Sequence, residues 1–169
     1  MIPQDKSWVA LLQNRLKEQY PLITVINSSV SGETSGGGLR RLPVLLKQHH
    51  PDLIIIELGG NDGLRGMPVA GIRANLEKII KLSQDSGAKV LLVGVRLPPN
   101  YGDTYTNAFF DNYKKVSKQY NTDLVPFFLD KVATVHNLMQ EDRIHPTEEA
   151  QPILLDTVWT YLNPMLEHN

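Results

Sequence analysis

An aspartate and a histidine three residues apart near the C-terminus form the pair with the clearest chemical potential in this sequence. The segment reads Asp142-Arg143-Ile144-His145-Pro146. If Asp142 accepts a hydrogen bond from one imidazole nitrogen of His145, it fixes the tautomer and leaves the other nitrogen as a general base for a nucleophile. The same spacing also occurs in surface ion pairs and helix-start caps. The pair alone leaves both interpretations open.

A second candidate segment, Gly59-Gly60-Asn61-Asp62, directly follows an apolar run. Two glycines and two short polar residues are typical of a sharp turn in which Asn or Asp bonds its own backbone. In a functional interpretation, the side-chain amide of Asn61 donates a hydrogen bond to a developing oxyanion.

A third candidate is the glycine-rich segment that runs from Ser31 to Gly38. Gly32 and Gly37 have the outer spacing of a phosphate-binding loop, but Gly38 and Leu39 stand where that motif requires Lys and Ser or Thr. The segment therefore predicts either a flexible turn into a helix or a site where the N–H of Gly32 approaches a ligand oxygen, because no Cβ intervenes.

These segments lie between elements that alternate along the chain. Apolar runs rich in β-branched residues predict strands at residues 23–30, 53–58, 90–95 and 123–128. Helical periodicity predicts helices at residues 8–19, 39–49, 69–83, 107–120 and 147–166. The alternation predicts a parallel α/β sheet with helices on both faces. In such sheets, binding and catalytic groups gather at the carboxyl ends of the strands, where the candidate segments fall.

Composition narrows the class of protein further. The 169 residues, 41% of them hydrophobic, predict a single domain over residues 1–169. The net charge of −1, from 17 basic and 18 acidic residues, argues against a nucleic-acid or membrane-surface protein held by bulk electrostatics. No apolar run approaches the ~18 residues of a bilayer-spanning helix, so we expect no stable membrane insertion. Cysteine is absent, which excludes disulfides and thiolate metal sites. The scattered histidines predict no metal site.

In their order along the chain, these features resemble the SGNH (GDSL-type) hydrolase family. The resemblance is carried by Gly32, the Gly-Gly-Asn-Asp segment and Asp142-x-x-His145-Pro, with further matches at residues 58–66, 96–102, 144–146 and 150–152. It runs from about residue 8 to the C-terminus and is strongest to the bacterial branch of acyl-CoA thioesterase I, lysophospholipase and arylesterase enzymes.

The resemblance implies a fold, a set of roles and a location. The implied fold is a three-layer αβα structure with a flavodoxin-like parallel sheet of strand order 2-1-3-4-5. Gly32 and Asn61 take the positions of oxyanion-hole donors, and Asp142 and His145 take those of the catalytic acid and base. The substrates would be small-molecule acyl esters or thioesters, with no cofactor, and the full-length family form would be periplasmic or secreted. Nothing in the sequence indicates an oligomeric state.

One part of the family pattern is missing. The family carries its nucleophilic serine in Gly-Asp-Ser-Leu after the first strand, but this sequence contains neither Gly-Asp-Ser nor Gly-x-Ser-x-Gly. Ser31 lies beside Gly32, but the family has a serine there in addition to its nucleophile. The chain starts with Met1-Ile2-Pro3-Gln4, where the family continues past the nucleophile turn. We therefore expect an N-terminally truncated SGNH domain without the first strand.

The expected function is that of a serine ester and thioester hydrolase whose present chain is inactive, because the attacking group is absent. Two alternatives stay open: a non-catalytic acyl- or carbohydrate-binding relative, and a metal-dependent phosphoesterase that uses Asp62, Asp142 and His145. Loss of the first strand also removes the shared neighbour of residues 23–30 and 53–58. Because unpaired backbone groups are costly, we expect this chain to aggregate or to unfold in part.

Overall fold

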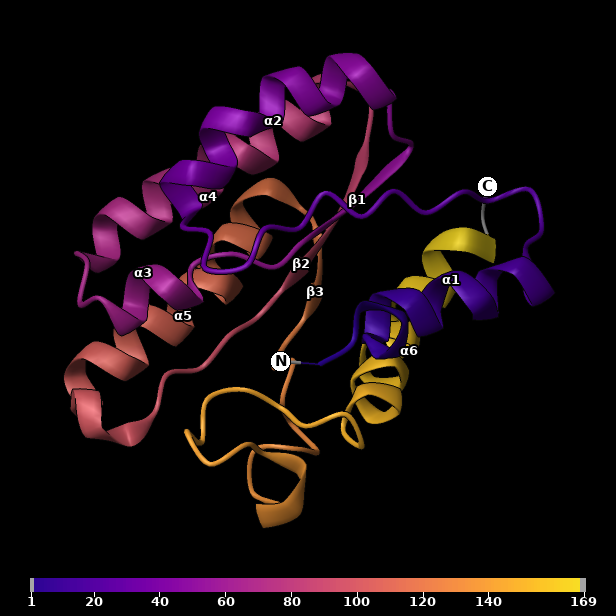
Figure 1. Ribbon diagram of the computed structural model, residues 1–169. Helices are drawn as coiled ribbons and strands as arrows, with labels where there is room; N and C mark the ends of the chain where they lie inside the picture. Colours follow the sequence, from indigo (N-terminus) through magenta and orange to yellow (C-terminus); the bar gives the residue numbers. More distant parts are fainter. Residues whose placement is uncertain (1, 168–169) are drawn as a thin grey trace. The chain divides into compact units, whose positions relative to one another are not determined.

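The computed structural model describes residues 2–167, which contain helices and a small sheet (Figure 1). The chain forms two compact units. Residues 30–127 make up the middle unit, and the residues up to 29 together with those from 128 onward make up the terminal unit. The prediction of one domain over residues 1–169 stays a prediction. Met1, at which the expected truncation was placed, lies outside the described residues.

The sheet of the middle unit has three parallel strands in the order β1-β2-β3: Leu53–Ile56, Lys89–Val93 and Asp123–Val125. In the ladder, Ile56 lies beside Leu92 and Val93 beside Val125. These strands correspond to three of the four predicted strands; each begins within a residue of its expected start but ends earlier. Pro126 follows β3 directly and has no N–H to donate to a further ladder bond.

The prediction of a strand at residues 23–30 is wrong. These residues adopt no strand, and β1 is paired only with β2 in the described part of the chain. Apolar side chains in the segment stay unburied, since Ile26 and Val30 are each 52% exposed. A strand needs a paired neighbour, the expected strand order gives this segment only the first strand as a partner, and the described residues contain no such strand.

Helices of the middle unit pack against one another in a row. The row runs from α2 to α4 and from α4 to α5, and α4 and α5 also contact β2. The bounds are α2 Ser35–His49, α3 Gly60–Leu64, α4 Val69–Asp85 and α5 Asp103–Tyr120, with a 3₁₀ turn at Pro99–Tyr101. The helices predicted at 39–49, 69–83 and 107–120 are therefore confirmed, with α2 and α5 each beginning four residues earlier than expected.

The core of the middle unit lies between β1, β2 and this row of helices. Ile56 and Leu92 from the strands pack with Leu76 of α4 and with Phe109 and Tyr113 of α5, all at most 4% exposed. Adjacent residues Leu91 and Leu92 both have no exposed surface, so β2 is buried on both faces. This burial explains why the strand reads as a continuous apolar run. The predicted α/β class with a parallel sheet flanked by helices is confirmed.

The terminal unit is built on a helix pair. Helix α1 packs against α6, and polar contacts fasten the pair: Arg15 binds Asp156 at 2.8 Å, and the Tyr20 hydroxyl donates to Asn163 at 2.8 Å. The bounds are α1 Trp8–Gln19 and α6 Gln151–Glu167, with short 3₁₀ helices at Gln4–Lys6 and His136–Leu138. The first prediction, residues 8–19, matches α1, whereas the last helix begins four residues later than predicted. Within residues 2–167, no helix is long and apolar enough to cross a bilayer.

Candidate active site

Gly32 lies in a tight turn at the start of the middle unit. The N–H of Glu33 donates to the carbonyl of Val30 at 3.2 Å, and Gly32 occupies the turn with φ +75°. Glycine suits this left-handed conformation because it has no Cβ. Nothing lies within 4 Å of the position that a Cβ would occupy. The backbone at Gly32 is therefore open on that side.

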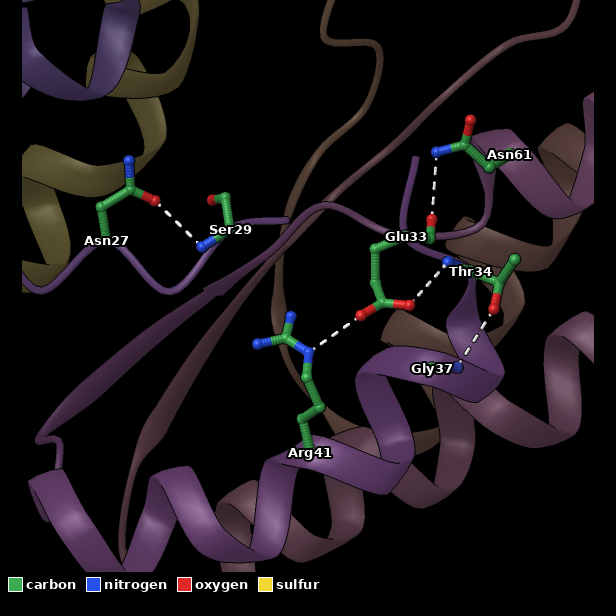
Figure 2. A network of polar contacts seen from close by, with 7 residues as sticks. All are labelled: Asn27, Ser29, Glu33, Thr34, Gly37, Arg41 and Asn61. Atoms are coloured by element: carbon green, nitrogen blue, oxygen red, sulfur yellow. Dashed lines mark hydrogen bonds and ion pairs between the residues drawn. The ribbon is translucent and has the colours of Figure 1, made fainter. Parts of the chain in front are cut away.

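The side chain of Glu33 stabilises the segment after the turn (Figure 2). Its carboxylate accepts hydrogen bonds from Nε of Arg41 at 2.8 Å and from the N–H of Thr34 at 3.1 Å. The bond from Arg41 is the main cause of a lowered Glu33 pKa. Thr34 in turn caps α2, since its hydroxyl accepts from the N–H of Gly37 at 3.1 Å. A side chain at Gly37 would overlap the Glu33 carboxyl group.

The Gly59 turn is built on a buried tyrosine. Gly59 has φ +103°, and a Cβ there would lie 2.6 Å from the Tyr113 hydroxyl. That hydroxyl donates to the carbonyl of Leu58 at 2.7 Å. The chain then enters the short helix α3, so the sequence prediction of a plain turn at residues 59–62 missed a helix.

Asn61 connects this turn to the Gly32 segment. Its side-chain Nδ2 donates to the backbone carbonyl of Glu33 at 3.0 Å, as Figure 2 shows. An amide nitrogen carries two hydrogens, so one N–H of Asn61 is held by this bond and the second is left to donate elsewhere. The structure thus brings Asn61 to the segment that carries Gly32.

A second link joins the same two segments through buried polar groups. Asp62 has no exposed surface; its Oδ2 accepts from the N–H of Ser35 at 2.8 Å and its Oδ1 from the Ser35 hydroxyl at 2.6 Å. Nδ2 of Asn75 in α4 donates to the same hydroxyl oxygen at 3.0 Å. Sequence reasoning missed Ser35 and Asn75, and it considered Asp62 only as a metal ligand. The one sequence signal that could have pointed to Ser35 was its position beside Thr34 at the start of a helix.

Asp142 and His145 lie in a closed loop of the terminal unit. Met139 and Pro146 form an antiparallel bridge across the base of the loop, and the N–H of Gln140 donates to the carbonyl of His145 at 2.8 Å. Arg143 adopts a left-handed conformation at φ +56°, which allows the chain to reverse.

The contact expected from the sequence is present: Nδ1 of His145 lies 2.7 Å from Oδ2 of Asp142. The other carboxylate oxygen accepts from the N–H groups of Ile144 at 2.9 Å and His145 at 3.0 Å. The bond to the His145 side chain, followed by these backbone bonds, lowers the pKa of Asp142 to about 2. An ionised Asp142 holds the proton of His145 on Nδ1 and leaves Nε2 as a proton acceptor. The His145 side chain is 67% exposed, so the ring is accessible.

The four predicted site residues therefore fall into two pairs. The structure places Asn61 against the Gly32 segment in the middle unit, and it places Asp142 against His145 in the terminal unit. The first pair can donate hydrogen bonds to negative charge, and the second can accept and return a proton.

Glu57 is a further titratable residue that sequence reasoning did not single out. It directly follows β1, and desolvation raises its pKa to about 7. More than a third of the residue is nevertheless exposed, so we expect water to weaken this effect relative to a sealed carboxyl group.

The metal-dependent alternative finds little support in the geometry. Across residues 2–167, no three His, Asp or Glu side chains are grouped so that they could hold a metal ion. Asp62, one of its three proposed residues, already accepts hydrogen bonds from Ser35 on both carboxylate oxygens.

Comparisons with known proteins point to one family. Residues 3–152 match the GDSL-like Lipase/Acylhydrolase family. The chain is 52% identical over 162 residues to Esterase TesA of Pseudomonas aeruginosa, an alignment that covers 96% of this chain and 81% of that protein. It is 50% identical to an arylesterase of Vibrio mimicus, covering 93% and 78% of the two chains. It is 41% identical to thioesterase 1/protease 1/lysophospholipase L1 of Escherichia coli K12, covering 96% and 77%.

Comparison with solved structures also finds esterases. A crystal structure of TesA superposes with a TM-score of 0.93 at 51% identity, covering 96% of this chain and 91% of the other. The psychrotrophic esterase EstA from Pseudoalteromonas sp., inhibited by monoethylphosphonate, superposes with a TM-score of 0.92 at 41% identity, covering 98% and 91%. AlinE4, an SGNH-hydrolase family esterase, gives 0.79 at 36% identity, covering 98% and 88%.

Proposed function

Because the chain belongs to the GDSL-like lipase/acylhydrolase family, we propose that it carries the proton-transfer and oxyanion-binding residues of a serine-dependent acyl ester and thioester hydrolase. The observation that carries the proposal is the 2.7 Å contact between Nδ1 of His145 and Oδ2 of Asp142. A carboxylate in this position orients an imidazole for general-base work. The names of the relatives, which are esterases and a thioesterase, support the substrate class.

In the proposed reaction, a serine hydroxyl attacks the acyl carbonyl while Nε2 of His145 takes its proton. The tetrahedral intermediate collapses to an acyl-enzyme, and His145 returns the proton to the departing alcohol or thiol. Water then attacks the acyl-enzyme, again giving its proton to His145, and the serine leaves with that proton. Asp142 stabilises the imidazolium that forms in each half and does not itself become protonated.

Gly32 and Asn61 receive the role of oxyanion donors. The backbone at Gly32 is open, and Asn61 has one N–H left after its bond to Glu33. Each such donor is worth about 10²–10³ in kcat.

The nucleophile has no candidate among these residues, because the sequence contains no Gly-Asp-Ser. We therefore propose that the 169-residue chain does not turn over esters by itself. A segment made of an apolar strand and Gly-Asp-Ser-Leu would have to supply the serine.

Two further proposals concern the substrate class and the cellular location. We propose that the substrates are acyl esters of lipids, including lysophospholipids, and that the family form with its nucleophile works in the periplasm or outside the cell. The absence of cysteine is compatible with an oxidising compartment as well as with the cytosol. Cell fractionation followed by an immunoblot tests the location, and recovery only in the cytoplasmic fraction contradicts it.

Activity is tested with two proteins side by side: the 169-residue chain, and a fusion in which a strand of about five residues and Gly-Asp-Ser-Leu precede it. We expect the fusion to hydrolyse p-nitrophenyl butyrate and the chain alone to give only the buffer rate. A fusion with serine replaced by alanine is the matched control. EDTA should leave the rate unchanged. Binding of butyrate without turnover by the fusion would instead indicate a non-catalytic relative, and loss of activity to EDTA would indicate a metal-dependent enzyme.

A further inference from the structure

The buried carboxylate of Asp62 has no place in the proton transfers described above. Both of its oxygens accept hydrogen bonds from Ser35, and neither Asp62 nor Ser35 has any exposed surface. Burying a carboxylate is costly unless hydrogen bonds compensate. Here the compensation comes entirely from another segment of the chain, 27 residues earlier in the sequence.

Capping of α2 accounts for only part of this arrangement, the bond from the N–H of Ser35 to Asp62. Thr34 already caps the helix through its hydroxyl and the N–H of Gly37. Asp62 instead belongs to the first turn of α3, so its bonds to Ser35 connect the first turns of two different helices. Asn75 of α4 donates to the Ser35 hydroxyl and thereby fixes the direction in which that hydroxyl donates.

Two links therefore join the same pair of segments. One runs from Asn61 to the carbonyl of Glu33, and the other runs between Asp62 and Ser35. A single hydrogen bond leaves two segments free to pivot about it, whereas two neighbouring links fix their orientation. Gly32 lies three residues before Ser35, and Asn61 directly precedes Asp62. The second link therefore lies close to both proposed oxyanion donors.

We propose that Asp62 is a positioning residue for the oxyanion hole. Together with Ser35 and Asn75, it holds the Gly32 segment against α3, so that the N–H of Gly32 and the free N–H of Asn61 converge on one substrate oxygen. This proposal rests on the oxyanion roles given to Gly32 and Asn61 above. Because the oxyanion forms in the tetrahedral intermediate and its flanking transition states and is absent from the bound ester, loss of Asp62 lowers kcat and leaves KM nearly unchanged.

Three variants weaken the link to different degrees. Asp62→Asn replaces one acceptor oxygen by a donor, so Ser35 loses a partner; we expect kcat of the fusion to fall about 10²-fold, the effect of misplacing a catalytic group by about 1 Å. Ser35→Ala keeps the N–H bond and should lower kcat less, and Asn75→Ala should lower it least. Val116→Ala, a cavity in the fully buried part of α5, is the control for a loss of stability alone.

A second readout does not depend on activity. In ¹⁵N-labelled protein, prepared both as the 169-residue chain and as the fusion, the side-chain amide of Asn61 gives two proton signals, one for the N–H bonded to Glu33 and one for the other. We expect Asp62→Asn and Ser35→Ala to shift both signals, and Val116→Ala to leave them in place even where its melting temperature falls as far. If Asp62→Asn does not fold, Ser35→Ala and Asn75→Ala carry the test.

The two readouts separate the possible failures. A fusion that hydrolyses nothing contradicts the proposed function, while the Asn61 signals still decide whether Asp62 orients that amide. An active fusion whose Asp62→Asn and Ser35→Ala variants keep kcat within about threefold of the parent overturns the positioning role. The same holds if KM rises in place of the fall in kcat, or if the Asn61 signals do not move in any of the three variants.

Discussion

Asp142 binds the imidazole of His145 and the backbone of the same loop at once. Oδ2 lies 2.7 Å from Nδ1 of His145, and Oδ1 accepts from the N–H groups of Ile144 and His145. The orientation of the ring is therefore set within a few residues of chain. A short loop closed by the bridge between Met139 and Pro146 is enough to hold the ring in one orientation.

The low pKa of Asp142 predicts a pH-dependent contribution to stability. The folded state holds this pKa near 2, below its ordinary value of 3.8, because His145 and the loop backbone bind the ionised form. A lowered pKa stabilises the fold above the ordinary value, and this stabilisation disappears as the pH falls toward the folded value. In urea unfolding, Asp142→Asn should be less stable than the parent at about pH 6, with a difference that shrinks by about pH 2.5. An equal difference at both pH values contradicts this.

The raised pKa of Glu57 predicts that its contribution to folding stability changes with pH in the opposite direction. Desolvation raises its pKa to about 7 from an ordinary 4.5, so the folded state holds the proton more tightly than the unfolded state. Stability from this group is greatest below the ordinary pKa and falls as the pH rises toward the folded value. Glu57→Gln should flatten the fall in melting temperature between about pH 4.5 and 7, modestly because the residue is partly exposed. Parallel curves for parent and variant would show that this carboxyl group is fully hydrated.

The close approach of Gly59 to Tyr113 predicts a coupled pair of substitutions. Gly59→Ala places a Cβ 2.6 Å from the Tyr113 hydroxyl and forces alanine to φ +103°, so we expect a loss of more than about 1 kcal/mol. Tyr113→Phe removes the bond to Leu58 and should cost about 1–3 kcal/mol. The double variant should lose less than the sum, because the clashing oxygen is gone. If the losses of unfolding free energy in denaturant simply add, the Cβ at residue 59 and the Tyr113 hydroxyl do not clash.

The unpaired side of β1 predicts that an added strand stabilises the chain. β1 pairs only with β2 in the described residues, and an open edge of apolar strand is a template for association. A peptide with an apolar strand and Gly-Asp-Ser-Leu should raise the melting temperature and reduce aggregation, whereas the same peptide with a central proline should not. A sharp transition of the chain alone that the peptide leaves unchanged contradicts the expected strand order.

Much of the fold could be predicted because local pattern and burial agree. Helix α1 has Leu12 and Leu16 at helical spacing on its buried side, and β2 is buried on both faces, so each carries a clear periodicity. Residues 23–30 have the same apolar character as a strand, but a strand needs a paired neighbour, and the described residues provide none for this segment. The composition of a segment shows whether it has apolar side chains to bury. Whether the segment pairs as a strand depends on the rest of the chain.

In the candidate site, a contact between residues close in sequence could be predicted, whereas the buried hydrogen bonds between distant segments could not. Asp142 and His145 are three residues apart, and this spacing together with the family resemblance predicted their contact. Ser35 and Asp62 are 27 residues apart, and Asn75 joins them from a third helix. No periodicity or motif connects those positions. Only the packing of α2, α3 and α4 brings them together.

The rate of ester hydrolysis by His145→Ala in the fusion carrying Gly-Asp-Ser-Leu tests the central claim most directly. If His145 is the base that Asp142 orients, kcat with p-nitrophenyl butyrate should fall by about 10³-fold or more, with residual catalysis from the oxyanion donors. His136→Ala, which changes an exposed histidine of the same unit, should keep the parent rate. Near-parental turnover by His145→Ala would contradict the account.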